Sequence, residues 1–252
     1  MQKVYSRPKY LKDAAFHYCP GCGHSIVHRL VAEVFEEMGI GERAIGVAPA
    51  GCAVLAYNYF DCDFVEGAHG RGAAIATGIK RRWPDAVVFS YQGDGDLAAI
   101  GTAETIHAAA RGENITIIFV NNGIYGMTGG QMAPTTLRGM KATTAPFGRE
   151  PRREGYNLDI THLVAEIEGT AFAARALITT PKEIKKAKKL IASAFECQLQ
   201  GRGFSIVELV SACPTNWKLS PLASIKFIEE NMAKAYPPGV LVERRLPEAA
   251  KE

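Results

Sequence analysis

The sequence has 252 residues, of which 47% are hydrophobic and 22% are charged, and its formal net charge at pH 7 is +3. A chain of this length can bury a substantial core, and we expect a single domain over residues 1–252. The near-neutral charge argues against nucleic-acid binding, and no apolar run approaches the roughly 20 residues that a membrane span requires, so we expect a cytoplasmic protein.

The N-terminal part of the chain contains a CxxC motif. Residues 1–16 have little periodicity and are expected to form an arm on the domain surface or on a partner. Cys19 and Cys22 follow in the segment CPGCGH, before a predicted helix over about 25–38. Attachment of a c-type haem needs His directly after the second cysteine, but here Gly23 intervenes. The CxxC motif could therefore be a redox pair, part of a metal site or part of a cluster site. A metal site or a cluster site would need further ligands.

Four more cysteines differ in how well they suit metal binding. Cys52 and Cys213 are expected in loops at strand ends, the latter after a predicted strand at 204–210. Cys62 lies between two aspartates, whose charges disfavour a thiolate. Cys197 shares a predicted helix with packing positions and is expected to be a buried thiol. The cysteine spacing alone fits structural zinc and an iron-sulfur cluster equally well.

Small residues at 70–78 predict a helix packed closely against the sheet or a partner, and His69 and Arg71 lie at its start. These two residues are candidates for a functional site, or else a surface histidine and a helix-capping arginine.

Residues 87–130 carry the strongest functional signal. Predicted strands at 87–91 and 115–120 flank a Gly-Asp-Gly-Asp turn and a helix at 97–111, and paired asparagines follow the second strand. Parallel strands bring Asp94 and the asparagines together at their carboxyl ends, where open α/β sheets bind ligands. Carboxylate and amide oxygens suit Mg²⁺, and the amino end of the helix suits a phosphate. The pattern predicts a Mg²⁺-diphosphate site.

The region after this core contains a long polar loop, 128–160, which is expected to close over a cofactor or to contact a partner. Within it, Thr128, Gly129 and Gln131 are candidate contacts of the cofactor or substrate. A cluster formed by Arg149, Arg152 and Arg153 is expected either to meet an acidic partner or to be solvated.

The C-terminal part predicts further strands and helices that continue the parallel sheet. A strand is predicted at 176–179, and the lysines of 182–189 are expected on the solvated face of an amphipathic helix. The segment 220–252 is expected to form a helix over 222–235 and a tail.

These motifs together resemble a known family. GDG, 25 residues and then NN is similar to the thiamine diphosphate signature, and NNGIYGMTGGQ resembles its version in the 2-oxoacid:ferredoxin oxidoreductases. With CPGCGH, HGR and CPTNW, the resemblance to the β subunit of that family extends over essentially the whole chain. It implies the α/β thiamine diphosphate-binding fold of the diphosphate-binding type, with a mostly parallel sheet flanked by helices.

The resemblance also implies site residues. The Mg²⁺ ligands would be Asp94, the Asn122 side chain and the Ile124 carbonyl, and a 4Fe-4S cluster would be held by Cys19, Cys22, Cys52 and Cys213. Catalytic candidates on this chain are His69, Arg71 and Thr128. The implied cofactor-binding set is Gly93, Asp94, Gly95, Asp96, Asn122, Ile124, Tyr125, Gly126, Met127 and Thr128.

The implied reaction is oxidative decarboxylation of a 2-oxoacid to acyl-CoA and CO₂, with electrons passed through the cluster to ferredoxin. The glutamate that activates thiamine diphosphate is expected on an α subunit carrying the pyrimidine domain, and γ and ferredoxin-like subunits are further expected partners. The alternative is a subunit of a non-oxidative thiamine diphosphate-dependent decarboxylase or ligase whose cysteines bind structural zinc. The sequence does not disclose which 2-oxoacid is used.

Overall fold

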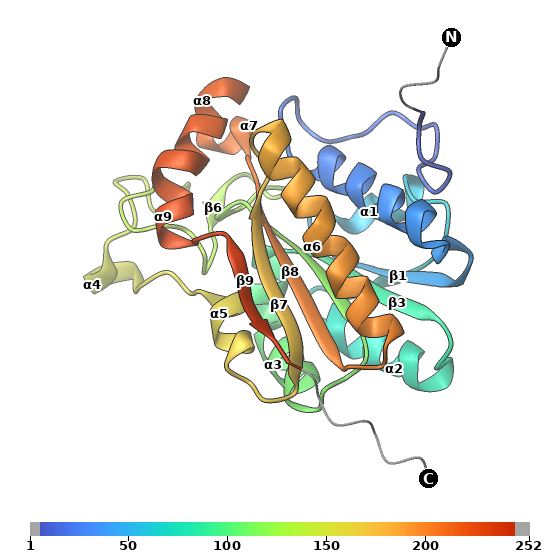
Figure 1. The fold of residues 1–252 in the computed structure, drawn as a ribbon. Coiled ribbons are helices and arrows are strands. Elements are labelled where there is room, and N and C mark those ends of the chain that lie inside the picture. The colour runs from blue at the N-terminus through green and yellow to red at the C-terminus, as the bar shows by residue number, and fades with distance from the viewer. Residues whose placement is uncertain (1–5, 245–252) are drawn as a thin grey trace.

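The computed structural model describes residues 6–244. The predicted arm over 1–16 and the predicted segment over 220–252 therefore lie partly outside the described residues. One seven-stranded sheet, in the order β2-β1-β3-β4-β8-β7-β9, organises the fold (Figure 1). Its strands are β1 Ala44–Pro49, β2 Asp63–Gly67, β3 Val87–Gly93, β4 Thr116–Asn121, β7 Thr170–Leu177, β8 Phe204–Val210 and β9 Gly239–Glu243.

The four strands β3, β4, β8 and β7 form the buried centre of the sheet. Nearly every residue in them is buried, which is typical of parallel strands covered on both faces. The pairings between described strands of this sheet are parallel except that of β9, which runs antiparallel to β7 at one edge. The prediction of a mostly parallel sheet is confirmed.

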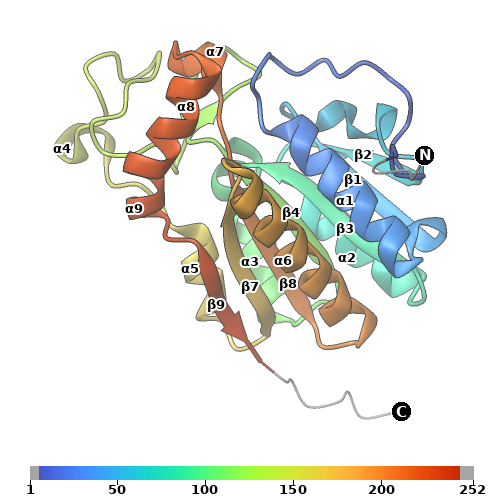
Figure 2. The same cartoon turned by 45° about the horizontal axis from the view of Figure 1, so that its top comes forward.

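Helices cover both faces of this sheet. In Figures 1 and 2, α1 and α6 lie on one face, and α2, α3 and α5 lie on the other. Two separate hydrophobic clusters fill the corresponding layers. In the described part of the chain, no helix is long and apolar enough to cross a membrane. The bounds of these helices are α1 His24–Met38, α2 Gly72–Arg82, α3 Thr102–Ala110, α5 Ile160–Ala165 and α6 Pro181–Leu199.

Shorter elements complete the chain. A small hairpin is formed by β5 Ile124–Tyr125 and β6 Gln131–Met132. The remaining helical segments are η1 Gly41–Arg43, η2 Val54–Asn58, η3 Asp96–Ile100, α4 Pro151–Glu154, α7 Pro214–Trp217, α8 Pro221–Phe227, η4 Ile228–Met232 and α9 Ala233–Ala235.

Local signals place the two long helices. α1 ends at Gly39, which adopts the left-handed conformation (φ 65°) that glycine favours at a helix end. α6 begins after Thr180, whose side chain caps the amide of Glu183. The lysines of α6 lie mostly on its exposed face, as predicted, although Lys188 also pairs with acidic residues of α1.

Two predicted elements differ from the structure, and a third is present in three segments. The strand expected at 176–179 is β7, which already begins at Thr170. The prediction missed its first part because that part is rich in alanine, a residue that does not signal a strand. The helix expected over 97–111 is divided at Gly101, where a β-carbon would lie 2.7 Å from the carbonyl oxygen of Gly70. The helix expected over 222–235 is confirmed as three consecutive segments, α8, η4 and α9.

The long polar loop over 128–160 is organised around a buried arginine. Arg149 is 6% exposed, and its guanidinium donates to backbone carbonyls of the same loop, including those of Pro134 and Thr136 at 2.8 and 2.7 Å. The expectation that Arg149 is solvated or meets an acidic partner is therefore wrong. A loop of this length buries carbonyls that no strand pairs, and the five donors of a guanidinium can satisfy them. Arg152 and Arg153 are exposed.

Candidate functional site

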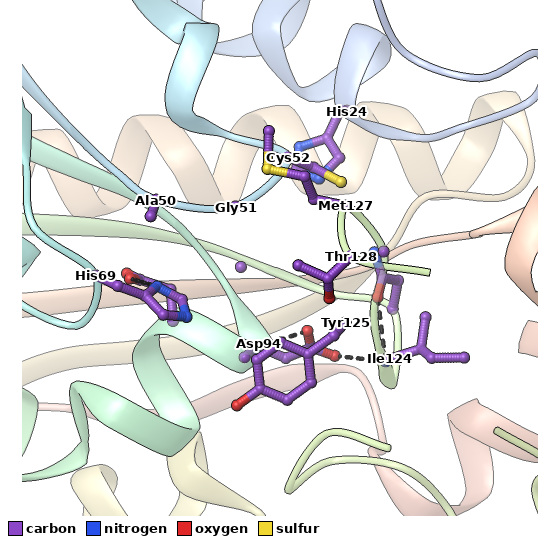
Figure 3. A pocket seen from close by; sticks show the side chains of 15 residues that line it. His24, Ala50, Gly51, Cys52, His69, Asp94, Ile124, Tyr125, Met127 and Thr128 are labelled. Atoms are coloured by element: carbon purple, nitrogen blue, oxygen red, sulfur yellow. Dashed lines mark hydrogen bonds and ion pairs between the residues drawn. The ribbon is translucent and has the colours of Figure 1, made fainter. Parts of the chain in front are cut away.

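A cavity of ≈ 160 Å³ opens at the carboxyl ends of β3 and β4 (Figure 3). It gathers segments that are far apart in the chain, because the parallel strands all end at this edge of the sheet. The residues that line it are Gly93, Asp94, Gly95, Asp96, Asn122, Ile124, Tyr125, Gly126, Met127 and Thr128, together with His24, Ala50, Gly51, Cys52 and His69. Every residue of the predicted cofactor-binding set thus lies around one space.

Asp94 is a buried acidic side chain of this cavity with several hydrogen-bond donors around it. It is 3% exposed, and its Oδ2 accepts hydrogen bonds from the amide of Ile124 at 3.0 Å and from Thr135 Oγ1 at 2.8 Å. Its Oδ1 accepts from the amide of Gly95 at 2.8 Å. Burial raises the pKa of the Asp94 carboxyl to about 6, and these hydrogen bonds partly offset the shift. A bound cation would favour the ionised form of such a carboxylate.

The two adjacent asparagines have different surroundings. Asn121 lies at the end of β4, and its Nδ2 donates to Glu208 Oε1 at 2.7 Å beneath the loop. Asn122 lines the cavity, and its Oδ1 accepts from the amide of Ile124 at 3.2 Å. β4 ends at Asn121, so Asn122 already belongs to the loop that turns into the cavity.

His69 and Arg71, the two candidates from the HGR segment, are separated by the structure. His69 lines the cavity, and its Nδ1 lies 2.7 Å from Asp96 Oδ1, which also accepts from the amide of Gly70 at 2.6 Å. Arg71 is not among the lining residues and pairs with Glu104 instead. The structure therefore places His69 at the cavity and Arg71 outside its lining.

Thr128, the third candidate, lines the cavity, whereas its neighbours Gly129 and Gln131 do not. The Thr128 hydroxyl donates to Gln131 Oε1 at 2.6 Å, and Gln131 Nε2 donates back to the carbonyl of Thr128 at 2.9 Å. Gln131 therefore acts here by fixing the turn that carries Thr128.

A second cavity, of ≈ 220 Å³, adjoins the first and is lined by Cys19, Cys22, Cys52 and Cys213. Four residues line both cavities, namely Cys52, Asn122, Gly126 and Met127. Among residues 6–244, no group of three or more His, Cys, Asp and Glu side chains is close enough to hold a single metal ion. The structure thus places the four thiols in the lining of one cavity.

The chemistry of these thiols argues against a nucleophilic redox pair. Burial raises the pKa of Cys22 and of Cys52 to about 12, and neighbouring thiols add to both shifts. A reactive cysteine needs a lowered pKa, so this environment favours thiols that ionise only when they bind a metal. Cys62 and Cys197 lie outside both cavities, and Cys197 is fully buried, as expected.

Sequence reasoning missed several residues of the site. His24 lines the first cavity; its Nδ1 lies 3.0 Å from Tyr91 Oη, and burial lowers its pKa to about 3, so the imidazole is neutral. Asn216 and Trp217 contact the loop after β4 through hydrogen bonds described below. The motifs CPGCGH and CPTNW contained these residues, but no spacing rule indicated where their side chains point.

A buried ion pair supports this edge of the sheet from beneath. Arg175 on β7 and Glu208 on β8 are each 1% exposed, with 2.7 Å between Arg175 Nε and Glu208 Oε2. Arg175 also pairs with Asp159, and Glu208 holds Asn121 as described above. The network therefore connects the centre of the sheet to the loop that carries Asn122.

Replacing Glu208 with alanine is expected to lower the free energy of unfolding by about 3 kcal/mol, because Arg175 would stay buried with one carboxylate removed. For a chain of this size, that loss corresponds to a fall in melting temperature of roughly 6–12 °C, measured by thermal denaturation. Glu230→Ala, which removes the exposed partner of Lys226, is the control and should cost less than about 1 kcal/mol. Equal effects of the two variants would contradict a stabilising role of the buried pair.

Comparisons with known proteins show which family this chain is similar to. Residues 49–209 match the family of the thiamine pyrophosphate enzyme C-terminal TPP-binding domain. Ketoisovalerate oxidoreductase subunit VorA of Methanothermobacter thermautotrophicus is 48% identical over 94% of this chain and 50% of that protein. 2-oxoglutarate synthase subunit KorB of Methanocaldococcus jannaschii is 40% identical over 88% of this chain and 81% of that protein. The chain thus spans half the length of VorA.

One solved structure is similar along almost the whole chain. It is a 2-oxoglutarate:ferredoxin oxidoreductase from Magnetococcus marinus with 2-oxoglutarate, coenzyme A and succinyl-CoA bound. The match has a TM-score of 0.81 at 28% identity and covers 97% of this chain and 87% of that one.

Proposed function

Because the chain belongs to the thiamine diphosphate-binding β subunits of the 2-oxoacid:ferredoxin oxidoreductases, we propose that it forms the cofactor-binding half of such an enzyme. The proposed reaction is the oxidative decarboxylation of a 2-oxoacid to acyl-CoA and CO₂, with electrons passed through a 4Fe-4S cluster to ferredoxin. The observation that carries this proposal is the shared wall of the two cavities, formed by Cys52, Asn122, Gly126 and Met127. An electron acceptor beside the cofactor is what an oxidative reaction needs.

The first cavity suits a Mg²⁺-bound diphosphate. Asp94 offers a carboxylate, Asn122 an amide oxygen and Ile124 a backbone carbonyl, which together make an all-oxygen donor set. Gly95 lets the turn pass directly beneath the Tyr125 ring, because a β-carbon there would lie 2.3 Å from it. When bound, thiamine diphosphate supplies the carbanion chemistry that 2-oxoacid decarboxylation requires. His69 and Thr128 are placed to contact the cofactor or substrate.

The second cavity suits a cluster better than a single zinc ion. Four thiolates hold a 4Fe-4S cluster, and Cys19, Cys22, Cys52 and Cys213 provide four around one space. Four thiolates would also suit a structural zinc ion, but one-electron chemistry beside thiamine diphosphate gives an iron-sulfur cluster a role and zinc none. Free thiols of this kind fit a reducing compartment, and we place the protein in the cytoplasm.

A partner must complete the first cavity. Its volume of ≈ 160 Å³ is below the roughly 300 Å³ at which ligand clefts begin. Among the described residues that line it there is no glutamate, so the glutamate that activates thiamine diphosphate would come from an α subunit with the pyrimidine domain. The γ and ferredoxin-like subunits are proposed as further partners, and CoA as cosubstrate.

The purified chain alone is therefore expected to be inactive, and the complex with its α subunit active. The measurement is CoA-dependent reduction of ferredoxin or a viologen dye, with pyruvate, 2-oxoglutarate and a branched-chain 2-oxoacid such as ketoisovalerate compared in parallel. Relatives named for ketoisovalerate and 2-oxoglutarate make those two the first substrates to test. Turnover by the chain alone would contradict the proposal that an α subunit supplies the missing half of the site. CoA-independent decarboxylation without dye reduction would favour the non-oxidative alternative.

A further inference from the structure

The short helix α7 borders the second cavity, which Pro214 and Asn216 line. Asn216 on this helix donates from Nδ2 to the carbonyl oxygen of Gly126 at 2.8 Å and to Cys213 Sγ at 3.3 Å. An amide nitrogen carries two hydrogens, so both bonds form together. The carbonyl oxygen of Gly126 can only accept, which fixes the orientation of the amide with Nδ2 rather than Oδ1 toward it.

The position of Gly126 makes this bridge short. A β-carbon on Gly126 would lie 3.1 Å from Cys52 Sγ and 3.6 Å from Cys213 Sγ, so the loop passes directly over two of the thiols. Gly130, later in the same loop, packs equally closely on Asn216, because a β-carbon there would lie 3.1 Å from its Oδ1. The loop that carries the proposed metal ligands therefore rests on Asn216 and on the sulfurs.

Trp217 supplies a second, independent bond from α7 to the same loop. Its Nε1 donates to the carbonyl oxygen of Asn122 at 3.1 Å, and its ring packs against Phe227 with 5.1 Å between ring centroids. The bonds from Trp217 and Asn216 hold the loop on either side of Ile124, whose carbonyl is a proposed Mg²⁺ ligand. The Asn216 amide donates both to the loop and to a thiol sulfur, whereas the Trp217 indole nitrogen donates to the loop alone.

We propose that Asn216 is a positioning residue shared by the two halves of the site: it fixes the metal-binding loop through Gly126 and raises the reduction potential of the cluster through Cys213. This inference rests on the proposed function. A hydrogen bond to a ligating sulfur stabilises the more negative, reduced cluster, and hydrogen bonds of this kind are among the factors that set the potentials of iron-sulfur proteins. Residues that orient metal ligands typically change metal affinity by about 10-fold or more when they are removed.

The test compares three variants of the full chain, purified anaerobically with its cluster. Asn216→Leu should shift the midpoint potential of the cluster, followed by electron paramagnetic resonance, to a more negative value. It should also weaken binding of thiamine diphosphate with Mg²⁺ about 10-fold in a thermal-shift titration. Trp217→Phe should weaken that binding without moving the midpoint. Asn231→Leu, at an exposed asparagine that caps only the carbonyl of Phe227, should change neither quantity.

Each outcome bears on a distinct claim. If Asn216→Leu does not fold, Asn216→Ser removes the same two amide hydrogen bonds with a smaller side chain and should shift both quantities in the same directions. A cluster-bearing wild type whose midpoint is unchanged by loss of the Asn216 amide would overturn this inference and leave the proposed function intact. A wild-type protein without iron and acid-labile sulfide would overturn the proposed function and the inference with it.

Discussion

Asp94→Asn is expected to abolish the rise in melting temperature that thiamine diphosphate with Mg²⁺ gives the wild-type protein. The substitution keeps the size of the side chain but removes the charge that the proposed Mg²⁺ site depends on. It also turns one of two accepting oxygens into a donor, opposite amides that already donate to Asp94. The loop that carries Ile124 and the proposed Mg²⁺ ion would therefore lose the carboxylate that holds them both.

The size of the lost effect follows from linkage. Ligand at 100 times its dissociation constant stabilises a protein by about 2.7 kcal/mol. For a chain of this length, that corresponds to a rise of roughly 5–11 °C in the wild type. Differential scanning fluorimetry with and without cofactor measures the rise directly.

The matched control is Asp85→Asn, at an exposed aspartate just before β3, at the other end of the strand. It should leave the full rise in place. A comparison of the two variants without ligand separates a loss of binding from a loss of fold. If Asp94→Asn responded to cofactor as the wild type does, the assignment of the first cavity to a Mg²⁺-diphosphate would be wrong.

The elements that carry the site were the most predictable part of the fold. β3 and β4 are rich in apolar and aromatic residues and are followed by glycine, aspartate and asparagine, so their identity and their parallel pairing both follow from pattern. β9 and the early part of β7 were missed, because an edge strand after a Pro-Pro pair and a strand of alanines lack such a signal. The site lies at the ends of β3 and β4. Because these two strands could be predicted from the sequence, the site could be predicted as well.

Side-chain direction was the main limit on predicting the site. Asn121 and Asn122 are the same residue type one position apart, yet only Asn122 lines the cavity. Arg149 looks like a surface charge in sequence, and only its packing against loop carbonyls shows that it is buried. Asn216 joins two motifs separated by 90 residues, a relation that no local spacing contains.

Cys19→Ala is expected to remove most of the iron and acid-labile sulfide from the protein, whereas Cys62→Ala should leave both at the wild-type level. Cys19 is the exposed member of the four cavity thiols, so its loss costs little packing and any loss of iron reports on ligation. Cys62 is partly buried beside the hydrophobic core and outside the second cavity. The two substitutions are chemically identical, and only the position of the thiol differs.

The assay also decides between the two metals that the cysteine spacing allowed. Iron and sulfide in equal amounts, with a charge-transfer absorption that Cys19→Ala loses, would support the cluster. Zinc at one ion per chain without sulfide would show that the thiols close around a single ion, and the electron path from the first cavity would then have no acceptor on this chain. Equal iron content in Cys19→Ala and Cys62→Ala would exclude the second cavity as the place where iron binds.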